Sequence, residues 1–137
     1  MLDCLERDST ARSQSLQVAH QLLENGWGLY LGQEEEQSLE RLLKLDFINV
    51  TVRFFPDVMM FIQEGEKRHK SQKISLGAKT PDGKPTYLDY SLKLPPRSLG
   101  EFSRWVYRFM GSAQFLKPKE LVEKHVSSAQ QLLARYP

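Results

Sequence analysis

Two clusters of basic side chains are the strongest signals for binding chemistry in this sequence. Lysine and arginine release counterions when they bind phosphates, so a dense basic run favours contact with a polyanion. A solvated surface loop is the alternative interpretation of the same run. Arg104 and Arg108, four residues apart on a predicted helix, form a second patch, unless Glu101 pairs with Arg104. The denser cluster consists of Lys67, Arg68, His69, Lys70 and Lys73.

The residues needed for covalent or metal chemistry are too few and too dispersed to predict an enzyme. His20, His69 and His125 do not have metal-ligand spacing, and the single cysteine, Cys4, excludes a zinc cluster built on thiolates. The sequence contains no G-x-S-x-G nucleophile motif and no glycine-rich phosphate loop. Flanking cations are expected to lower the pKa of His69. We therefore expect no catalytic residue, no metal and no cofactor.

Charge is distributed unevenly along the 137 residues, although the net charge is only +2. Residues 1–46 hold nine acidic and four basic residues, a net charge of −5. Residues 47–137 hold 15 lysines and arginines against eight acids, a net charge of +7. A basic globular part suggests an anionic partner, such as nucleic acid or another anionic effector, although many proteins with a pI of 8.7 bind no polyanion.

Residues 1–46 read as a helical arm or linker. Apolar spacing predicts helices over residues 9–24 and 33–44, and a short apolar run predicts a strand over residues 27–31. Neither a secretory leader nor an apolar run of membrane-spanning length is visible in the sequence. We therefore expect a cytoplasmic protein with no membrane partner.

Residues 47–137 read as one α+β domain. Alternating and helical patterns predict the order strand, helix, strand, strand, helix, strand and a terminal helix, at residues 47–54, 56–64, 73–79, 86–94, 98–110, 113–117 and 120–136. This is the ferredoxin-like βαββαβ order, in which two helices cover one face of a four-stranded antiparallel sheet. The polar strand residues then face the other way: Asn49, Thr51, Arg53, Lys73, Ser75, Lys79, Tyr87, Asp89 and Lys93.

That open face allows three interpretations: it binds a ligand, it pairs with a second copy, or the arm covers it. RNA-recognition domains stack bases on aromatic side chains of the central strands. Here the third strand has no glycine, and Tyr87 is its one aromatic side chain on the open face. Arg53 and Lys93 would supply the positive charge beside it. The exposed apolar Phe47 and the short strand over Ala113–Lys117 favour pairing into a homodimer.

From residue 47 onward the sequence resembles the C-terminal extension, also called WCX, of WYL-domain transcriptional regulators. The resemblance rests on five stretches and covers about the last two-thirds of the chain: VTVRFFPDV, EGEKRHKSQKI, DGKPTYLDYSLKL, RSLGEFSRWVYRFMGSAQFLKPKELVEKH and ARYP. Such regulators combine a DNA-binding winged helix, a WYL domain and this ferredoxin-like extension. The resemblance implies that the chain pairs subunits and helps a WYL module to sense an effector.

The chain departs from that plan at its N-terminal end. Residues 1–46 contain no helix-turn-helix and no WYL tripeptide, so they are read as the end of a WYL module or as an unrelated arm. We expect a non-enzymatic regulatory module that dimerises and responds to an anionic effector. The alternative is an autonomous domain that binds single-stranded nucleic acid on a basic open sheet face.

Overall fold

The structure is a computed structural model that describes residues 2–65 and 67–137. Glu66, which precedes the basic cluster in the sequence, lies outside the described residues. The helices and strands follow in the order α1 (Leu2–Asn25), α2 (Glu34–Arg41), β1 (Ile48–Phe54), α3 (Pro56–Glu64), β2 (Lys73–Leu76), β3 (Leu88–Leu94), α4 (Leu99–Tyr107), β4 (Ala113–Lys117) and α5 (Lys119–Ala134). Single 3-10 turns precede α4 (Pro96–Ser98) and β4 (Met110–Ser112).

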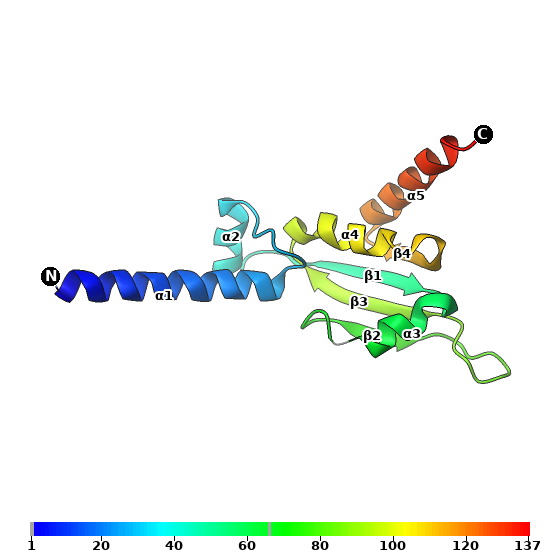
Figure 1. The fold of residues 1–137 in the computed structure, drawn as a ribbon, viewed down its shortest axis with the longest axis horizontal. Coiled ribbons are helices and arrows are strands. Elements are labelled where there is room, and N and C mark those ends of the chain that lie inside the picture. The colour runs from blue at the N-terminus through cyan, green and yellow to red at the C-terminus, as the bar shows by residue number, and fades with distance from the viewer. Residues whose placement is uncertain (1, 66) are drawn as a thin grey trace.

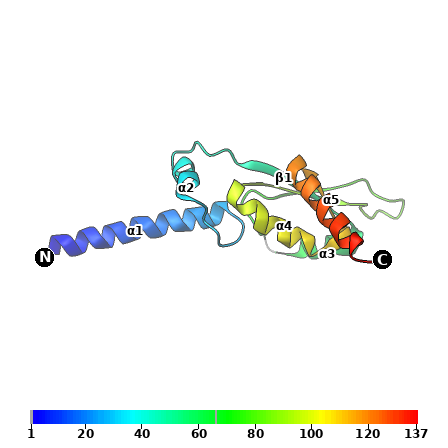
Figure 2. The ribbon, with the colours of Figure 1, turned by 90° about the horizontal axis from the view of Figure 1, so that it is seen from above.

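The four strands form one antiparallel sheet in the order β2-β3-β1-β4 (Figure 1). With α3 between β1 and β2 and α4 between β3 and β4, this is the ferredoxin-like arrangement. Both of these helices lie on the same side of the sheet (Figure 2). The predicted α+β fold, with a helical N-terminal arm and a C-terminal helix, is therefore confirmed.

The helix-facing side of the sheet is a continuous apolar core, because side chains alternate along each strand. Phe102 of α4 is fully buried against it, and the Trp105 ring centroid lies 5.8 Å from those of both Phe54 and Tyr90. From α3, Met59 and Ile62 join the same core. The two central strands contribute Val50, Val52, Phe54, Leu88, Tyr90, Leu92 and Leu94.

The arm differs from the sequence prediction in two places. Residues 27–31, predicted as a strand, instead form a bend, because Gly28 and Gly32 adopt φ angles of +85° and +84°. Trp27 packs against the core, with its ring centroid 5.0 Å from that of Phe102. α2 ends before the predicted residue 44, since Leu43 has a φ angle of +58°.

The helices predicted from apolar spacing leave much of their apolar surface exposed, because α1 and α5 extend beyond the sheet and α2 lies beside α1 (Figure 1). Leu22 of α1 and Leu121 of α5 are buried, but most of the other described apolar side chains of these two helices are not. On β2, Ile74 and Leu76 pair with core residues and remain partly exposed. Exposed apolar side chains in the segments predicted as helices include Leu16, Leu23, Leu39, Leu42, Leu43, Met110, Val126, Leu133 and Tyr136.

Truncation of Phe102 should destabilise the domain far more than truncation of Tyr87. Phe102 is fully buried, and a buried Phe→Ala change costs about 3–5 kcal/mol of unfolding free energy. Phe102→Ala should therefore lower the melting temperature by roughly 10–20 °C in a thermal unfolding scan. Tyr87→Ala, on the opposite face, should cost about 1 kcal/mol, mainly because it removes a cation–π interaction with Arg53. Equal destabilisation by the two changes would show that the two faces are wrongly assigned.

Candidate functional site

The open face of the sheet carries a row of polar residues that crosses all four strands. Lys73 of β2 pairs with Ser91 of β3, which pairs with Thr51 of β1. Thr51 in turn pairs with Lys117 of β4. The exposed residues Lys73 and Lys117 are therefore three strands apart, a distance of about 14 Å at about 4.8 Å per strand. Between them, the hydroxyl oxygens of Thr51 and Ser91 are hydrogen-bonded at 3.0 Å. Lys93 is exposed on the same face, so three exposed lysines flank a pair of hydroxyl residues, of which Thr51 is buried and Ser91 half-buried.

A second row on this face carries the predicted residues Arg53 and Tyr87, but the charge of Arg53 is already paired. Arg53 donates hydrogen bonds from Nε and Nη2 to the Asp89 carboxylate at 2.9 and 3.1 Å. The hydrogen bond to Asp89 raises the pKa of Arg53. The guanidinium lies 3.7 Å from the centroid of the Tyr87 ring, which lies so close to Gly77 that a Cβ there would overlap it. The charges of Arg53 and Asp89 cancel, so this row offers no free cation to a ligand.

In the basic loop, Arg68 has a structural role. Its guanidinium donates to the carbonyl oxygens of Ile62 and Phe61 at 3.2 and 3.3 Å, in the last turn of α3. Cationic side chains at this position stabilise a helix C-terminus. The same guanidinium lies 5.4 Å from the Phe61 ring centroid and 5.5 Å from that of Trp105. Arg68 therefore anchors the loop to the helical side of the domain and is not available as a free phosphate contact.

His69 is buried and joins the loop to the arm. Its Nε2 donates to the Asn25 carbonyl oxygen at 2.8 Å, and its Nδ1 then accepts from the backbone N–H of Ser71 at 3.1 Å. The Ser71 hydroxyl accepts from the backbone N–H of Lys93 at 2.9 Å, so the contact continues into β3. Burial is the main cause of the lowered pKa of His69, with Lys70 and Lys67 lowering it further. The lowered pKa of His69 agrees with the sequence prediction, but the alternative interpretation of this run as a solvated loop is wrong for His69.

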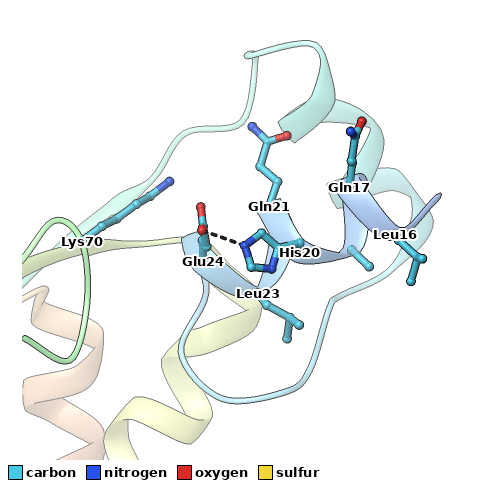
Figure 3. Close-up of a pocket in the computed structure, with 8 residues that line it drawn as sticks. Leu16, Gln17, His20, Gln21, Leu23, Glu24 and Lys70 are labelled. Atoms are coloured by element: carbon cyan, nitrogen blue, oxygen red, sulfur yellow. Dashed lines mark ion pairs between the residues drawn. The ribbon is translucent and has the colours of Figure 1, made fainter. Parts of the chain in front are cut away.

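Lys70 extends toward the arm rather than toward the sheet face. Its Nζ donates to the side-chain oxygen of Asn25. Figure 3 shows Lys70 beside the C-terminal turns of α1, where His20 and Glu24 form an ion pair at 3.0 Å. The sequence pattern of this loop predicts anion binding, but Arg68 contacts α3, and His69 and Lys70 contact α1. Within the cluster, Lys67 and Lys73 remain as exposed lysines.

A buried ion cluster around Arg97 fixes the arm on the domain, and sequence reasoning missed it. Arg97 Nη1 lies 2.8 Å from Glu36 and 2.6 Å from Glu40, while Nη2 donates to the Leu22 carbonyl oxygen at 3.0 Å. Burial lowers the pKa of Arg97, but the two carboxylates outweigh it and raise the pKa overall. Glu40 also accepts from the Asn25 side chain at 2.6 Å, which links this cluster to His69.

The predicted site residues therefore divide into three groups, apart from Lys67, which is exposed in the loop before β2. Lys73 and Lys93 share the open face with Lys117, which the sequence analysis did not select because strand register decides its position. Arg104 and Arg108 are exposed on and just after α4, on the helical side of the sheet, away from that face. The remaining predicted residues, Arg53, Arg68, His69, Lys70 and Tyr87, are engaged in contacts within the chain.

Searches of the described residues for other sites give negative results. Among the side chains that the structure describes, at residues 12–65 and 67–137, no group of three or more His, Cys, Asp or Glu could hold a metal ion. None of the helices in the described part of the chain is long and apolar enough to cross a membrane. The open lysine face is thus the candidate site with the clearest chemistry, which is binding of an anion.

Comparison with known families gives one match. The family model described as the WCX domain matches residues 46–133, about two-thirds of the chain. The matched residues contain the whole sheet, the helices α3 and α4, and nearly all of α5. No curated protein matches the chain.

Burial of His69 makes the free energy of unfolding depend on pH. Since its pKa is lowered from 6.5 in the folded chain, the unfolded chain binds more protons as pH falls below that value. The stabilisation from neutral His69 is therefore complete above about pH 6.5 and is lost progressively at lower pH. Urea unfolding at about pH 7.5 and about pH 5.5 should show a smaller pH-dependent loss of stability for His69→Gln than for the wild type.

His125 provides the matched control, because burial lowers its pKa as well, away from the arm. His125→Gln should remove its own contribution and leave that of His69 intact. An identical pH dependence in the wild type and in His69→Gln would contradict the assignment of a neutral, buried His69.

Proposed function

The chain belongs to the WCX domain family, a regulator-associated class of module, and from this premise we propose that it is a non-enzymatic part of a WYL-type transcriptional regulator. Its role would be to pair subunits and to respond to an anionic effector on the open sheet face. The observation that carries the effector role is the row of lysines and hydroxyls across all four strands. The family match supports the regulatory context, and the lysine face supports the anionic chemistry.

Phosphate groups are the anions best suited to the lysine face. Lys73, Lys93 and Lys117 are point charges on flexible stems, which bind phosphates without demanding one geometry. The hydroxyls of Thr51 and Ser91 share one hydrogen bond, so one of the two protons remains able to donate. Beside them, Tyr87 and the paired Arg53 offer a flat surface on which a base could stack.

Subunit pairing has support from exposed apolar surface. Leu39 and Leu42 on α2 are 44% and 63% exposed, and Phe47, before β1, is 39% exposed. Exposed apolar side chains mark interaction sites in soluble proteins where they form a patch. The edge strand β2 also has a free side in the four-stranded sheet, with all its residues exposed.

Charge reversal on the open face tests the effector role. The double variant Lys73→Glu/Lys93→Glu should weaken binding of a single-stranded oligonucleotide by at least about tenfold, measured by fluorescence anisotropy at several salt concentrations. The salt dependence should also flatten, by about 0.7 in the log–log slope for each phosphate that the variant no longer neutralises. Thermal unfolding should be nearly unchanged, since neither lysine is buried.

The matched control is Arg104→Glu/Arg108→Glu, which makes the same change of charge on the helical side of the sheet. It should reduce affinity much less. Equally weakened binding by both double variants would mean that net charge, not the open face, drives binding.

Sedimentation of the unmodified chain separates the two functional hypotheses. A dimer with no oligonucleotide affinity at low salt supports the pairing role and removes nucleic acid as the ligand of the face. A monomer that binds single strands in a salt-sensitive way supports the autonomous nucleic-acid-binding alternative.

A further inference from the structure

A groove of about 320 Å³ opens where α5 leaves the body of the domain. The first turns of α5 pack against β4, with Leu121 buried, but the later part of the helix diverges from the sheet (Figure 1). The groove lies between one face of α5 and the turn that joins α4 to β4. Its lining residues are Tyr107, Met110, Gly111, Ala113, His125, Ser128, Ala129 and Leu132.

One wall of the groove is a fixed pair of aromatic rings. The rings of Tyr107 and His125 are stacked at a centroid distance of 5.1 Å and an interplanar angle of 19°. Phe115, which is buried in β4, meets both rings edge-on, at 6.3 Å from Tyr107 and 5.3 Å from His125. Because Phe115 holds both rings, the wall is preorganised for a planar molecule.

The groove carries no formal charge, in contrast to the basic domain around it. None of its lining residues is an acid, a lysine or an arginine, and burial lowers the pKa of His125 and so favours its neutral form. The lining offers an ion no charged partner, so the occupant should be uncharged. The small side chains at Gly111, Ala113 and Ala129 leave the space open.

Polar atoms of the lining are available to orient an occupant. Among the hydrogen bonds between described residues, none involves the Tyr107 hydroxyl, the His125 ring nitrogens or the Ser128 hydroxyl. A few such groups in an otherwise apolar lining are typical of small-molecule sites.

The backbone at the rim of the groove is strained. Met110 adopts a φ angle of +49°, in the left-handed region that side chains other than glycine rarely occupy. Strained residues of this kind cluster at ligand clamps and active sites. The Met110 side chain is 60% exposed, and a flexible thioether chain of this type adapts readily to a bound molecule.

From these observations we propose that the groove binds a small, uncharged aromatic molecule, which lies against the Tyr107–His125 wall and under Met110. Its volume is near the lower end of the range of small-molecule sites, about 300–1,000 Å³. The site is separate from the lysine face, so the proposal does not depend on the function proposed above.

Titration of the full chain with indole tests this proposal. Indole is neutral and planar, and its one N–H donor can reach His125 or Ser128. The methyl NMR signals of Met110, Ala113 and Ala129 should shift along saturable curves, while methyl signals of the arm stay constant. Ala129→Leu should fill the groove and weaken indole binding at least about tenfold, which is about 1.4 kcal/mol.

Two further variants serve as a control and as a second way to block the groove. Gln130→Leu adds the same side chain at the next, exposed position of α5, outside the lining, and should leave indole binding unchanged. Gly111→Leu provides an independent block, since a Cβ at Gly111 meets nothing within 4 Å and its φ angle is not in the left-handed region. Gly111→Leu should therefore fold and weaken binding even if Ala129→Leu disturbs α5.

Three results would overturn the proposal. Shifts that grow linearly up to the solubility limit of indole would show that no site exists. Tighter binding of indole-3-acetate than of indole would show that a charged ligand is preferred. Shifts of the same methyl signals on raising the protein concentration alone would assign the groove to a second copy of the chain.

Discussion

The buried guanidinium of Arg97 is the constraint on which the arrangement of the arm depends. An arginine cannot lose its charge in a protein, so once it is buried it must be matched by carboxylates. Both partners, Glu36 and Glu40, come from α2, and a third contact comes from the carbonyl oxygen of Leu22 in α1. Removing one member of such a cluster leaves an unpaired buried charge, at a cost of about 3–5 kcal/mol. Residues 22–40 are therefore held against the sheet domain by side-chain contacts, in addition to their connection along the chain.

The same cluster explains why the basic loop is not the free anion site that its sequence suggests. Asn25 links Glu40 to His69, and Ser71 links His69 to the backbone of β3. The loop is thus a junction between the arm, α3 and the sheet. Strand alternation directs Lys73 and Lys93 to the open face, and a register shift between Thr51 and Val52 brings Lys117 opposite Thr51. The β-sheet geometry that builds the core therefore also builds the candidate site.

Local patterns predicted the sheet well, because alternation along β1 and β3 is a property of consecutive residues. They failed where the outcome depends on distant parts of the chain. Val126 and Leu39 lie on regular helical stripes, yet both are exposed. α5 diverges from the sheet after its first turns, and α2 is held to the domain through Glu36 and Glu40 instead of through its leucines. Arg97 pairs with Glu40 and Glu36, which precede it by 57 and 61 positions in the sequence. Lys117 lies on the open face because of its register with β1. No short-range spacing signals either contact.

Amide hydrogen exchange on the Arg97→Gln variant tests most directly whether this arginine holds the arm on the domain. Gln is uncharged and too short to bridge both carboxylates, so Glu36 and Glu40 would lose their shared partner. We expect α2 and the last turn of α1 to lose protection, while β1 and β3 keep theirs. Unchanged protection in α2, or an equal loss of protection across the whole sheet, would contradict it.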